Sequence, residues 1–290
     1  MRVLLTGASG FLGRYVLSQL TQQGIDAVVV GRSRPAEHRA DYIQADLLQV
    51  DDCTAIAQRA RATHLIHLAW YAEHGKYWAS PLNLRWLEAS VRLVEAFCSA
   101  GGQKVVAAGT CAEYDWSCGY CREDTTPLSP ASMYGTAKDA TRRLGAAVCG
   151  AHQVPFAWGR IFLPYGQGED RRRLIPSLIE VFQGRRPPFG VNASAYRDFL
   201  HAEDVARGFM RLLLSDAVGT YNISSGQPTQ IAEVVRLIAC AVDGDSRIVL
   251  DLSTERPGEP EMLIGDSRKL KALGWQATHT VADIAISQEL

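Results

Sequence analysis

The chain has 290 residues, of which 47% are hydrophobic and 21% are charged, and its formal net charge is −1. This length and composition are typical of a compact globular protein with one large domain or two closely joined domains. The near-neutral charge excludes a global basic field that would attract nucleic acid or an anionic membrane. No stretch reaches the roughly 18 apolar residues that a membrane-spanning helix needs. We therefore expect neither a nucleic-acid nor a membrane partner.

The seven cysteines are an odd number scattered along the chain, which favours reduced thiols in the cytosol over a disulfide framework. The apolar run 3–5 leads directly into a glycine turn and not into the cleavage site of a signal peptide, so we expect a cytoplasmic protein. Cys118 and Cys121, with Cys111 nearby, lack a second close pair of ligands. The sequence therefore predicts no metal site.

Short β-branched apolar runs alternate with longer segments of helical periodicity, which is typical of a parallel sheet covered by helices on both faces. The expected strands, in chain order, are 2–6, 26–31, 42–45, 64–69, 104–108 and 156–162. The expected helices between them are 11–23, 51–61, 81–100 and 131–151. Right-handed crossovers then predict an α/β fold with a Rossmann-type doubly wound sheet.

Beyond Pro164 the pattern loosens, because Pro and Gly cluster repeatedly and the expected elements become short. We expect a dinucleotide-binding domain of residues 1–165, joined by about 198–225, and a smaller mixed α/β substrate-binding lobe of residues 166–197 and 226–290. Ligands of such sheets bind beyond the carboxyl ends of the strands, so the second lobe would close over the site.

A glycine-rich turn joins the first expected strand to the first expected helix. Gly7 allows the tight turn, Gly10 lets the backbone approach a pyrophosphate, and Gly13 lets the helix pack on the strand. The start of the helix, at Phe11 and Leu12, offers free N–H groups and a positive dipole end to phosphates. The spacing is Gly-x-x-Gly-x-x-Gly, and its position between strand and helix predicts a dinucleotide site.

The end of the second strand distinguishes NAD from NADP. NAD sites often place Asp or Glu there to hold the ribose 2′-hydroxyl, whereas this sequence has Gly31, Arg32 and Ser33. A small residue followed by Arg and Ser accommodates a 2′-phosphate, so NADP is the predicted cofactor and NAD the alternative. The other interpretation of Arg32 is a solvated loop residue. Asp46 and Leu47, after the third strand, are placed to flank the adenine.

Tyr134 and Lys138 lie four residues apart at the start of an expected helix and so share one helical face. A phenol with its ordinary pKa of about 10 is a sluggish acid or base at neutral pH. A neighbouring ammonium favours the phenolate, so we expect Lys138 to lower the pKa of Tyr134 and make proton exchange practical. Lys138 can also bond to the nicotinamide ribose of a cofactor.

The chain resembles the extended short-chain dehydrogenase/reductases of the nucleotide-sugar epimerase/dehydratase family. The matching segments follow the family's order over nearly the whole length and are 6–13, 67–69, 109–114, 123–138, 159–168, 197–201, 219–226, 256–259 and 273–275. The resemblance implies an NAD(P)-dependent oxidoreductase with a nucleotide-sugar substrate. It also implies a homodimer in which each subunit contributes two helices, here 81–100 and 131–151, although burial within the monomer equally explains their apolar character.

The resemblance implies roles for individual residues. Thr110 would hydrogen-bond the reacting sugar oxygen, Tyr134 would donate or accept the proton, and Lys138 would be its electrostatic partner. Ala69 matches the segment that contacts the cofactor. Asn83 matches a helix Asn that supports the active-site region, with ordinary helix-surface polarity as the other interpretation.

Arg197, Arg256 and Glu259 match family positions that hold the nucleotide's diphosphate and ribose. Arg suits phosphate through its bidentate fork, although each of these residues could instead form a structural ion pair. Leu163 replaces an Asn that the family places on the diphosphate. The nucleotide would then sit differently, or the substrate would differ from an ordinary UDP-sugar.

An aromatic segment, residues 70–78, follows the fourth strand and departs from common epimerases of the family. Trp70 and Tyr71 are predicted to bind substrate, because aromatic rings form a stacking platform for a sugar or a base. Packing of these rings at the lobe interface is the alternative interpretation.

The residues after Thr110 exclude one reaction of the family. Cys111 and Ala112 occupy positions where 4,6-dehydratases carry Asp and Glu, and neither residue can supply the acid and base of water elimination. Glu113 lies one residue further along, and strand alternation predicts that it points elsewhere.

Two reactions remain. One is NADPH-dependent reduction of a 4-keto-6-deoxy nucleotide sugar, and the other is C4 epimerisation with tightly held NAD. Arg32 favours reduction, which is therefore the predicted function, with epimerisation as the alternative. A non-catalytic NADP-binding sensor is a third hypothesis, disfavoured because Tyr134 and Lys138 are both present.

Overall fold

The larger lobe is built on a parallel sheet of seven strands in the order β11-β7-β5-β4-β1-β2-β3. The computed structural model describes residues 1–35, 40–49, 53–255 and 258–285. The strands of this sheet are β1 (Arg2–Thr6), β2 (Asp26–Gly31), β3 (Asp41–Gln44), β4 (His64–His67), β5 (Lys104–Thr110), β7 (Phe156–Ile161) and β11 (Gly219–Ile223). Every neighbouring pair is parallel. The predicted Rossmann-type α/β fold is confirmed.

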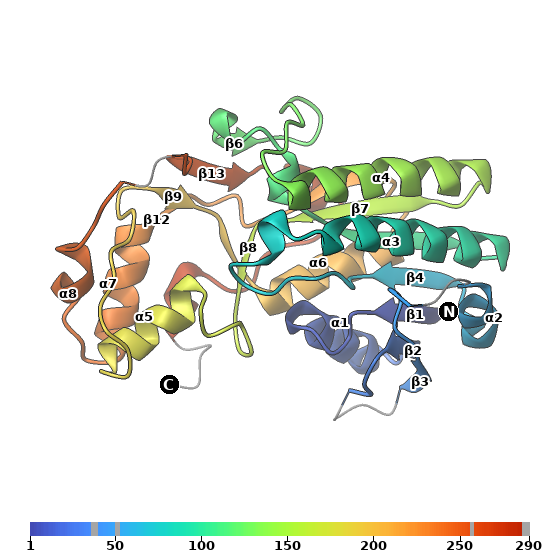
Figure 1. Cartoon of the computed structure of the whole chain (residues 1–290), viewed down its shortest axis with the longest axis horizontal. Coiled ribbons are helices and arrows are strands. Elements are labelled where there is room, and N and C mark those ends of the chain that lie inside the picture. The colour runs from blue at the N-terminus through green and yellow to red at the C-terminus, as the bar shows by residue number, and fades with distance from the viewer. Residues whose placement is uncertain (36–39, 50–52, 256–257, 286–290) are drawn as a thin grey trace.

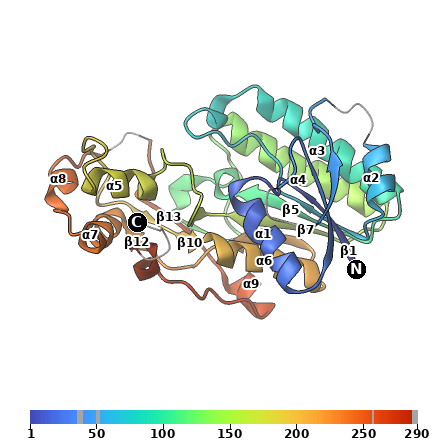
Figure 2. The ribbon, with the colours of Figure 1, turned by 90° about the horizontal axis from the view of Figure 1, so that it is seen from below.

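Helices cover both faces of the sheet (Figures 1 and 2). One face carries α1 (Phe11–Gln22) and α6 (Ala202–Leu214), and the other carries α2 (Thr54–Ala60), α3 (Leu82–Ser99) and α4 (Met133–Ala151). Adjacent residues of one strand serve opposite layers, because strand side chains alternate between faces. In β1, Leu5 packs in the cluster beneath α1 and α6, whereas Leu4 packs beneath α2 and α3.

The smaller lobe combines short strands and helices, as the mixed α/β prediction had it. Its elements are β6 (Tyr120–Cys121), β8 (Leu163–Tyr165), β9 (Tyr196–Arg197), β10 (Phe199–His201), β12 (Thr229–Gln230), β13 (Met262–Gly265), α5 (Leu174–Phe182), α7 (Ile231–Ala241) and α8 (Arg247–Leu250). Helix α9 (Arg268–Ala272) packs instead against β11, with Leu270 in the core of the larger lobe. Strands β12, β9, β13 and β6 form one sheet with both antiparallel and parallel pairs. A buried apolar cluster around Leu178 and Val234 joins α5 to α7. Short 3-10 turns are η1 (Tyr77–Ala79), η2 (Cys111–Glu113), η3 (Trp116–Cys118) and η4 (Val281–Ala285).

The expected element boundaries differ from the observed ones mainly at the carboxyl edge of the sheet. Strand β5 continues to Thr110, because its register with β7 extends that far. Strand β4 ends at His67, because the Ala69 N–H turns toward the Thr6 hydroxyl, at 3.3 Å. Helix α2 begins at Thr54, and positions 51 and 52 of the expected helix lie outside the described residues.

The seventh strand, β11, was not among the expected strands, although the larger domain was expected to include its segment. It pairs with β7 at the edge of the sheet. The proposed domain boundaries themselves stay a prediction. None of the described helices combines the length and the apolarity that a membrane span requires.

Candidate active site

The glycine turn forms a narrow cradle between β1, β4 and α1. Gly7 has a φ of +78°, and a Cβ there would lie 2.8 Å from the Ala69 nitrogen. A Cβ on Gly13 would lie 1.9 Å from the Gly7 carbonyl oxygen, so helix and turn touch through backbone. Gly10 precedes α1 without a side-chain cap, and the first turn of α1, which starts at Phe11, has no acidic residue. The first N–H groups of α1 are thus available to a pyrophosphate.

The residues expected around the adenosine half of a cofactor lie along the carboxyl edge of β2 and β3. Arg32 and Ser33 are exposed on the bend after β2. Asp46 follows β3, and its Oδ1 accepts the Leu48 N–H at 3.1 Å. Leu47 is buried in the apolar core, so its side chain does not face an open site. Leu12, in the first turn of α1, also packs partly against the core.

Thr110, Tyr134 and Lys138 come together where β5 meets α4. The Ser132 hydroxyl caps α4 by accepting the Gly135 N–H at 3.1 Å. A Cβ on Gly135 would lie 2.2 Å from the Ala112 carbonyl oxygen, so the first turn of α4 rests directly on the turn after β5. This contact brings the Tyr134 phenol into a hydrogen bond with the Thr110 side chain.

Burial sets the protonation of Tyr134 and Lys138. It raises the pKa of Tyr134 above its usual range and lowers the pKa of Lys138 to about 7. The Lys138 Nζ donates to the Ala108 carbonyl oxygen at 2.9 Å and lies 4.0 Å from the centre of the Trp70 ring. The expectation that Lys138 lowers the pKa of Tyr134 is therefore wrong for this structure. Enclosure of the phenol outweighs the ammonium, which is directed at a carbonyl and an indole.

Aromatic rings enclose Tyr134. Tyr77, Trp78 and Trp70 meet it edge to face, with ring centres at 4.8, 5.7 and 6.4 Å. Trp116 in turn meets Trp78 at 6.0 Å, perpendicular to it. Trp116 had no predicted role, because no local spacing ties this residue to Tyr134.

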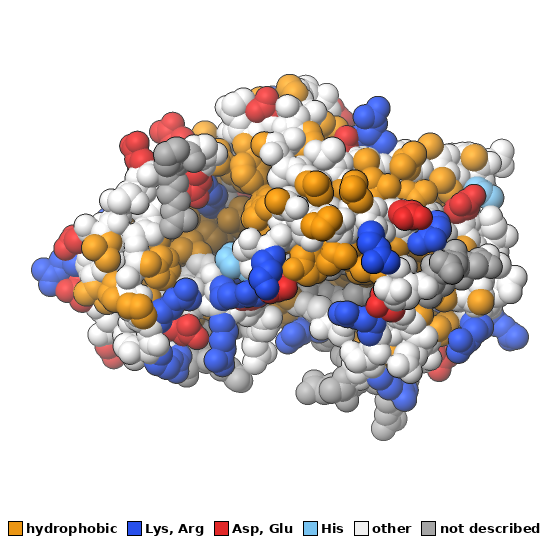
Figure 3. All heavy atoms as spheres, viewed as in Figure 1, with side chains coloured by type: hydrophobic (Ala, Val, Ile, Leu, Met, Phe, Trp, Pro, Cys, Tyr) orange, Lys and Arg blue, Asp and Glu red, His pale blue; other side chains and the backbone are white. Residues whose placement is uncertain are grey.

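An open cavity of about 310 Å³ adjoins this aromatic enclosure. Its walls are formed by Trp78, Ala112, Tyr114, Asp115, Trp116, Ser117, Ser129, Ala131, Ser132 and Gly258. Two indoles give it apolar faces, and three serines and one carboxylate give it a polar rim. Hydrophobic side chains also gather in the hollow between the two lobes (Figure 3). The cavity is wide enough to admit part of a small polar molecule, and Trp78, which lines it, also contacts Tyr134, although Tyr134 itself is not one of its lining residues.

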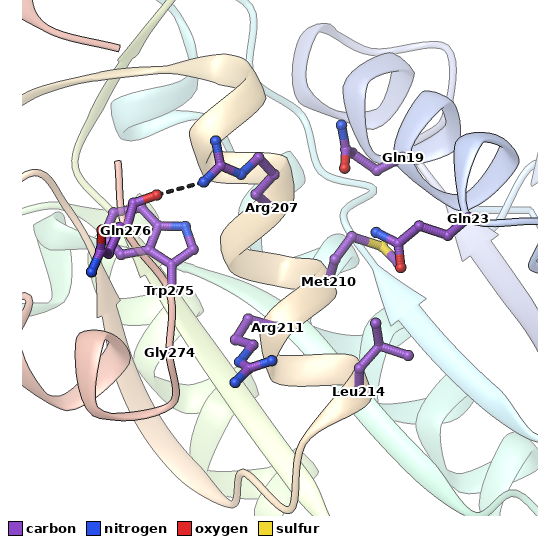
Figure 4. Close-up of a pocket in the computed structure, with 9 residues that line it drawn as sticks. All are labelled: Gln19, Gln23, Arg207, Met210, Arg211, Leu214, Gly274, Trp275 and Gln276. Atoms are coloured by element: carbon purple, nitrogen blue, oxygen red, sulfur yellow. Dashed lines mark hydrogen bonds between the residues drawn. The ribbon is translucent and has the colours of Figure 1, made fainter. Parts of the chain in front are cut away.

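A second cavity of similar size, about 320 Å³, lies on the opposite face of the sheet (Figure 4). It is a groove between α1, α6 and the segment around Trp275, and Arg207 crosses it to donate to the Gln276 carbonyl oxygen at 2.6 Å. No carboxylate, histidine or tyrosine is among its lining residues. It therefore offers no acid–base chemistry.

Glu113 is buried beneath the site, and its carboxylate accepts hydrogen bonds from the backbone and from two side chains. One of its oxygens accepts the Thr110 N–H at 2.8 Å and the Trp158 indole N–H at 2.9 Å, and the other accepts from Arg160 at 2.7 Å. With the Thr110 hydroxyl accepting the Ala112 N–H, this arrangement is a capping box. The Thr-x-x-Glu spacing is the sequence signal that predicts it. Glu113 lies in the 3-10 turn η2 and not in a strand, so strand alternation does not set its direction, and its carboxylate is taken up by these hydrogen bonds.

The residues predicted to bind substrate fall into separate groups. The Arg197 Nη2 and the Glu259 Oε1 form an ion pair at 2.9 Å, whereas Arg256 lies outside the described residues. The Tyr71 hydroxyl donates to Glu73 at 2.9 Å. The pairing of Arg197 with Glu259 fits the structural interpretation of these two residues, and their contact with a nucleotide stays a prediction.

Asn83 is buried at the start of α3 and is bonded on all sides. Its Oδ1 accepts the Trp70 indole N–H at 2.9 Å, and its Nδ2 donates to the Tyr77 and Ser80 carbonyl oxygens at 2.7 and 3.0 Å. The surface-polarity interpretation of Asn83 is thereby excluded. Trp70 also stacks on Trp86, with ring centres 6.2 Å apart and an interplanar angle of 28°. Packing within the protein therefore describes Trp70 better than a platform open to sugar.

The doubly wound sheet, the glycine turn and the Thr110, Tyr134 and Lys138 cluster define a Rossmann-type dinucleotide-binding protein. The model of the NAD dependent epimerase/dehydratase family matches residues 3–224, and the chain belongs to that family.

Similar proteins extend over the whole chain. A UDP-glucose 4-epimerase of Azospirillum brasilense is 26% identical over 97% of this chain and 89% of that protein. The structure of MoeE5 in complex with UDP-glucuronic acid and NAD is 26% identical, with a TM-score of 0.84 over 99% of this chain and 97% of that one. The UDP-Glc/GlcNAc 4-epimerase of Campylobacter jejuni has a TM-score of 0.87 over 99% and 97%. At 20% identity, this last likeness shows the fold alone.

Proposed function

We propose that the protein uses a nicotinamide dinucleotide to act on a ring carbon of a nucleotide-linked sugar, and that its reaction is C4 epimerisation of a UDP-hexose. The observation that carries the proposal is the meeting of Thr110, Tyr134 and Lys138 beside an open cavity. The similar UDP-glucose 4-epimerases support the choice of reaction. They favour C4 epimerisation, which was the alternative prediction, over the reduction of a keto sugar, which was the main one.

The residues present fit a dinucleotide. The backbone of Gly7, Gly10 and Gly13 would hold the pyrophosphate at the start of α1, where a Cβ would fill the cradle. Ala69 borders the same cradle, and Lys138 would donate to the nicotinamide ribose. The chemistry that a dinucleotide held there would supply is reversible hydride transfer at the sugar carbon.

The side chains of the cluster would handle the proton. Thr110 would hold the reacting sugar oxygen in place with its hydroxyl. As the protonated phenol that burial favours, Tyr134 would give a proton to the sugar oxygen as a general acid. Taking the proton as a general base needs the phenolate, which the positive charge of a bound oxidised nicotinamide would favour. The cavity walled by Trp78 and Trp116 would receive the sugar ring on apolar faces, and the same rings exclude water from the phenol.

Elimination of water does not fit the neighbouring residues. Ala112 has no acid or base, and burial raises the pKa of the Cys111 thiol to about 12. Cys111 therefore stays protonated at neutral pH and supplies no base.

A second candidate is NADPH-dependent reduction of a 4-keto-6-deoxy nucleotide sugar. Arg32 and Ser33 are exposed at the end of β2, where an NAD site often has a carboxylate. The raised pKa of Tyr134 favours the same direction, because a protonated phenol is ready to donate to the alkoxide that a hydride creates.

One assay separates the two candidates. We expect purified protein with UDP-glucose and no added cofactor to form the C4 epimer, detected by NMR of the anomeric proton. Net oxidation of added NADPH by a 4-keto-6-deoxy nucleotide sugar, without epimer formation, would instead establish the reductase.

The Tyr134→Phe variant tests the chemistry itself. Loss of the hydroxyl should lower kcat by about 100-fold or more, the usual contribution of a general acid–base group. Tyr120→Phe, an exposed tyrosine on β6, is the matched control and should keep its activity. Undiminished turnover by Tyr134→Phe would refute the proposed mechanism.

A further inference from the structure

Trp70 lies between a charged side chain and a second indole. Its ring centre is 4.0 Å from the Lys138 Nζ, a distance at which an ammonium is attracted to the electron-rich face of an indole. Trp86 stacks on Trp70 at 6.2 Å, and the Trp70 edge meets Tyr134. The indole is thus packed against the proposed reaction centre from within the protein.

The orientation of this indole is held by α3. The Trp70 Nε1 donates to the Asn83 Oδ1 at 2.9 Å, and Asn83 is 0% exposed. The two Asn83 N–H bonds to the Tyr77 and Ser80 carbonyl oxygens leave that oxygen facing the indole. A buried amide with both ends satisfied does not flip, since flipping would set donors against donors.

Lys138 has three N–H donors to place. One bonds to the Ala108 carbonyl oxygen at 2.9 Å, and the Trp70 face attracts the ammonium from a second side. One donor is then left for the ribose hydroxyl. We propose that Trp70, oriented by Asn83, is a positioning residue that holds the Lys138 ammonium in place for the cofactor. The role of Lys138 toward the ribose rests on the proposed function, but the contact between indole and ammonium does not.

Few of the charged and titratable groups that face Lys138 can stabilise its ammonium form, so the contact with the Trp70 indole matters for its charge. From η2, Glu113 carries a negative charge toward it, but Glu113 is already paired with Arg160 from β7. From β4, His67 stays neutral because burial and the neighbouring Lys138 lower its pKa to about 3. From α4, Tyr134 stays a neutral phenol. Two aromatic faces also stabilise the charged form of Lys138, Trp158 on β7 at 5.9 Å and Trp70 at 4.0 Å, and Trp70 is the nearer of the two.

The test is a titration of the lysine itself. The chain has five lysines, so protein labelled with [13Cε]lysine gives few signals, and the signal lost in Lys138→Met assigns Lys138. In Trp70→Leu we expect Lys138 to titrate about one pH unit lower than in the native protein, because the aromatic face is gone. Trp70→Phe keeps a smaller aromatic face and should titrate in between.

Trp78→Leu is the matched control, since Trp78 lies on the same loop and contacts Tyr134. Its Lys138 titration should equal that of the native protein. An unchanged midpoint in both Trp70 variants overturns the proposal, and Trp70→Phe decides alone if Trp70→Leu does not fold. Because the titration needs no substrate, this outcome is independent of whether UDP-glucose is turned over.

Discussion

Lys138 and Tyr134 illustrate how burial controls the chemistry of single residues here. Both side chains are driven toward their neutral forms, which raises the pKa of the phenol and lowers that of the amine to about 7. A buried ammonium costs free energy that the fold must supply elsewhere. The charged form of Lys138 therefore lowers the stability of the folded protein.

Lys138→Met should therefore stabilise the protein while abolishing activity. The folded-state pKa of about 7 lies below the unfolded value of about 10.4, so the cost of the charge is full below pH 7 and disappears as the pH rises toward 10. We expect a gain on the order of 2–4 kcal/mol at pH 6 and little gain near pH 10. Urea unfolding at several pH values measures it.

Lys76→Met is the control for this experiment, because Lys76 is exposed and paired with Glu73. The difference in free energy of unfolding between Lys76→Met and the native protein should hardly change between pH 6 and pH 9, since Lys138 is present in both. A gain for Lys138→Met that is independent of pH would show that the buried charge is not its cause.

At the scale of elements, the site depends on two local devices that the sequence displays. The Thr-x-x-Glu capping box fixes the backbone of Thr110 at the end of β5. The small glycines allow α1 to touch the turn after β1 through backbone, since a Cβ on Gly13 would lie 1.9 Å from the Gly7 oxygen. Local spacing is enough to predict both devices, because all their atoms come from one short segment.

Gly13→Ala should destabilise the protein by about 1–3 kcal/mol, because the backbone contact cannot open without moving α1. We also expect at least a tenfold loss of dinucleotide affinity in titration calorimetry, since the moved turn no longer fits the pyrophosphate. Gly150→Ala, near the end of α4 with no atom within 4 Å of its Cβ position, should be neutral or stabilising. If Gly13→Ala matched the native protein in stability and in dinucleotide affinity, the proposed pyrophosphate site at the glycine turn would be refuted.

The aromatic enclosure behaves differently from these devices. Tyr77 and Trp78 come from the loop after β4 and Trp116 from the turn after β5, and they meet only because the sheet places β4 beside β5. Trp70 lies in the same sequence segment as Trp78 but is turned toward Lys138. Sequence periodicity predicts neither the meeting of these rings nor the direction of Trp70, because the direction of a side chain in an irregular loop depends on its tertiary neighbours.

At the scale of the whole molecule, an apolar surface covers α3 and α4 (Figure 3). Leu84 on α3 is 59% exposed and Leu144 on α4 is 47% exposed. Contiguous apolar surface of this kind marks contact sites between proteins. It supports the homodimer that the family resemblance implied.

We expect light scattering to give twice the chain mass of 31.7 kDa at micromolar concentration. The double variant Leu84→Glu, Leu144→Glu should be a monomer, because two charges per subunit would be buried at the interface. Leu214→Glu, an equally exposed leucine on α6 across the sheet, should remain a dimer. A native protein that is monomeric under these conditions would contradict the prediction.

The sequence by itself determined the doubly wound sheet, the glycine turn and the spacing of Tyr134 and Lys138, because periodicity and short motifs depend on neighbours along the chain. Tertiary structure alone decided the protonation of those two residues, the pairing of Arg197 with Glu259, and the direction of Trp70. Each of these depends on burial and on contacts between segments far apart in sequence, and such contacts leave no local pattern to read.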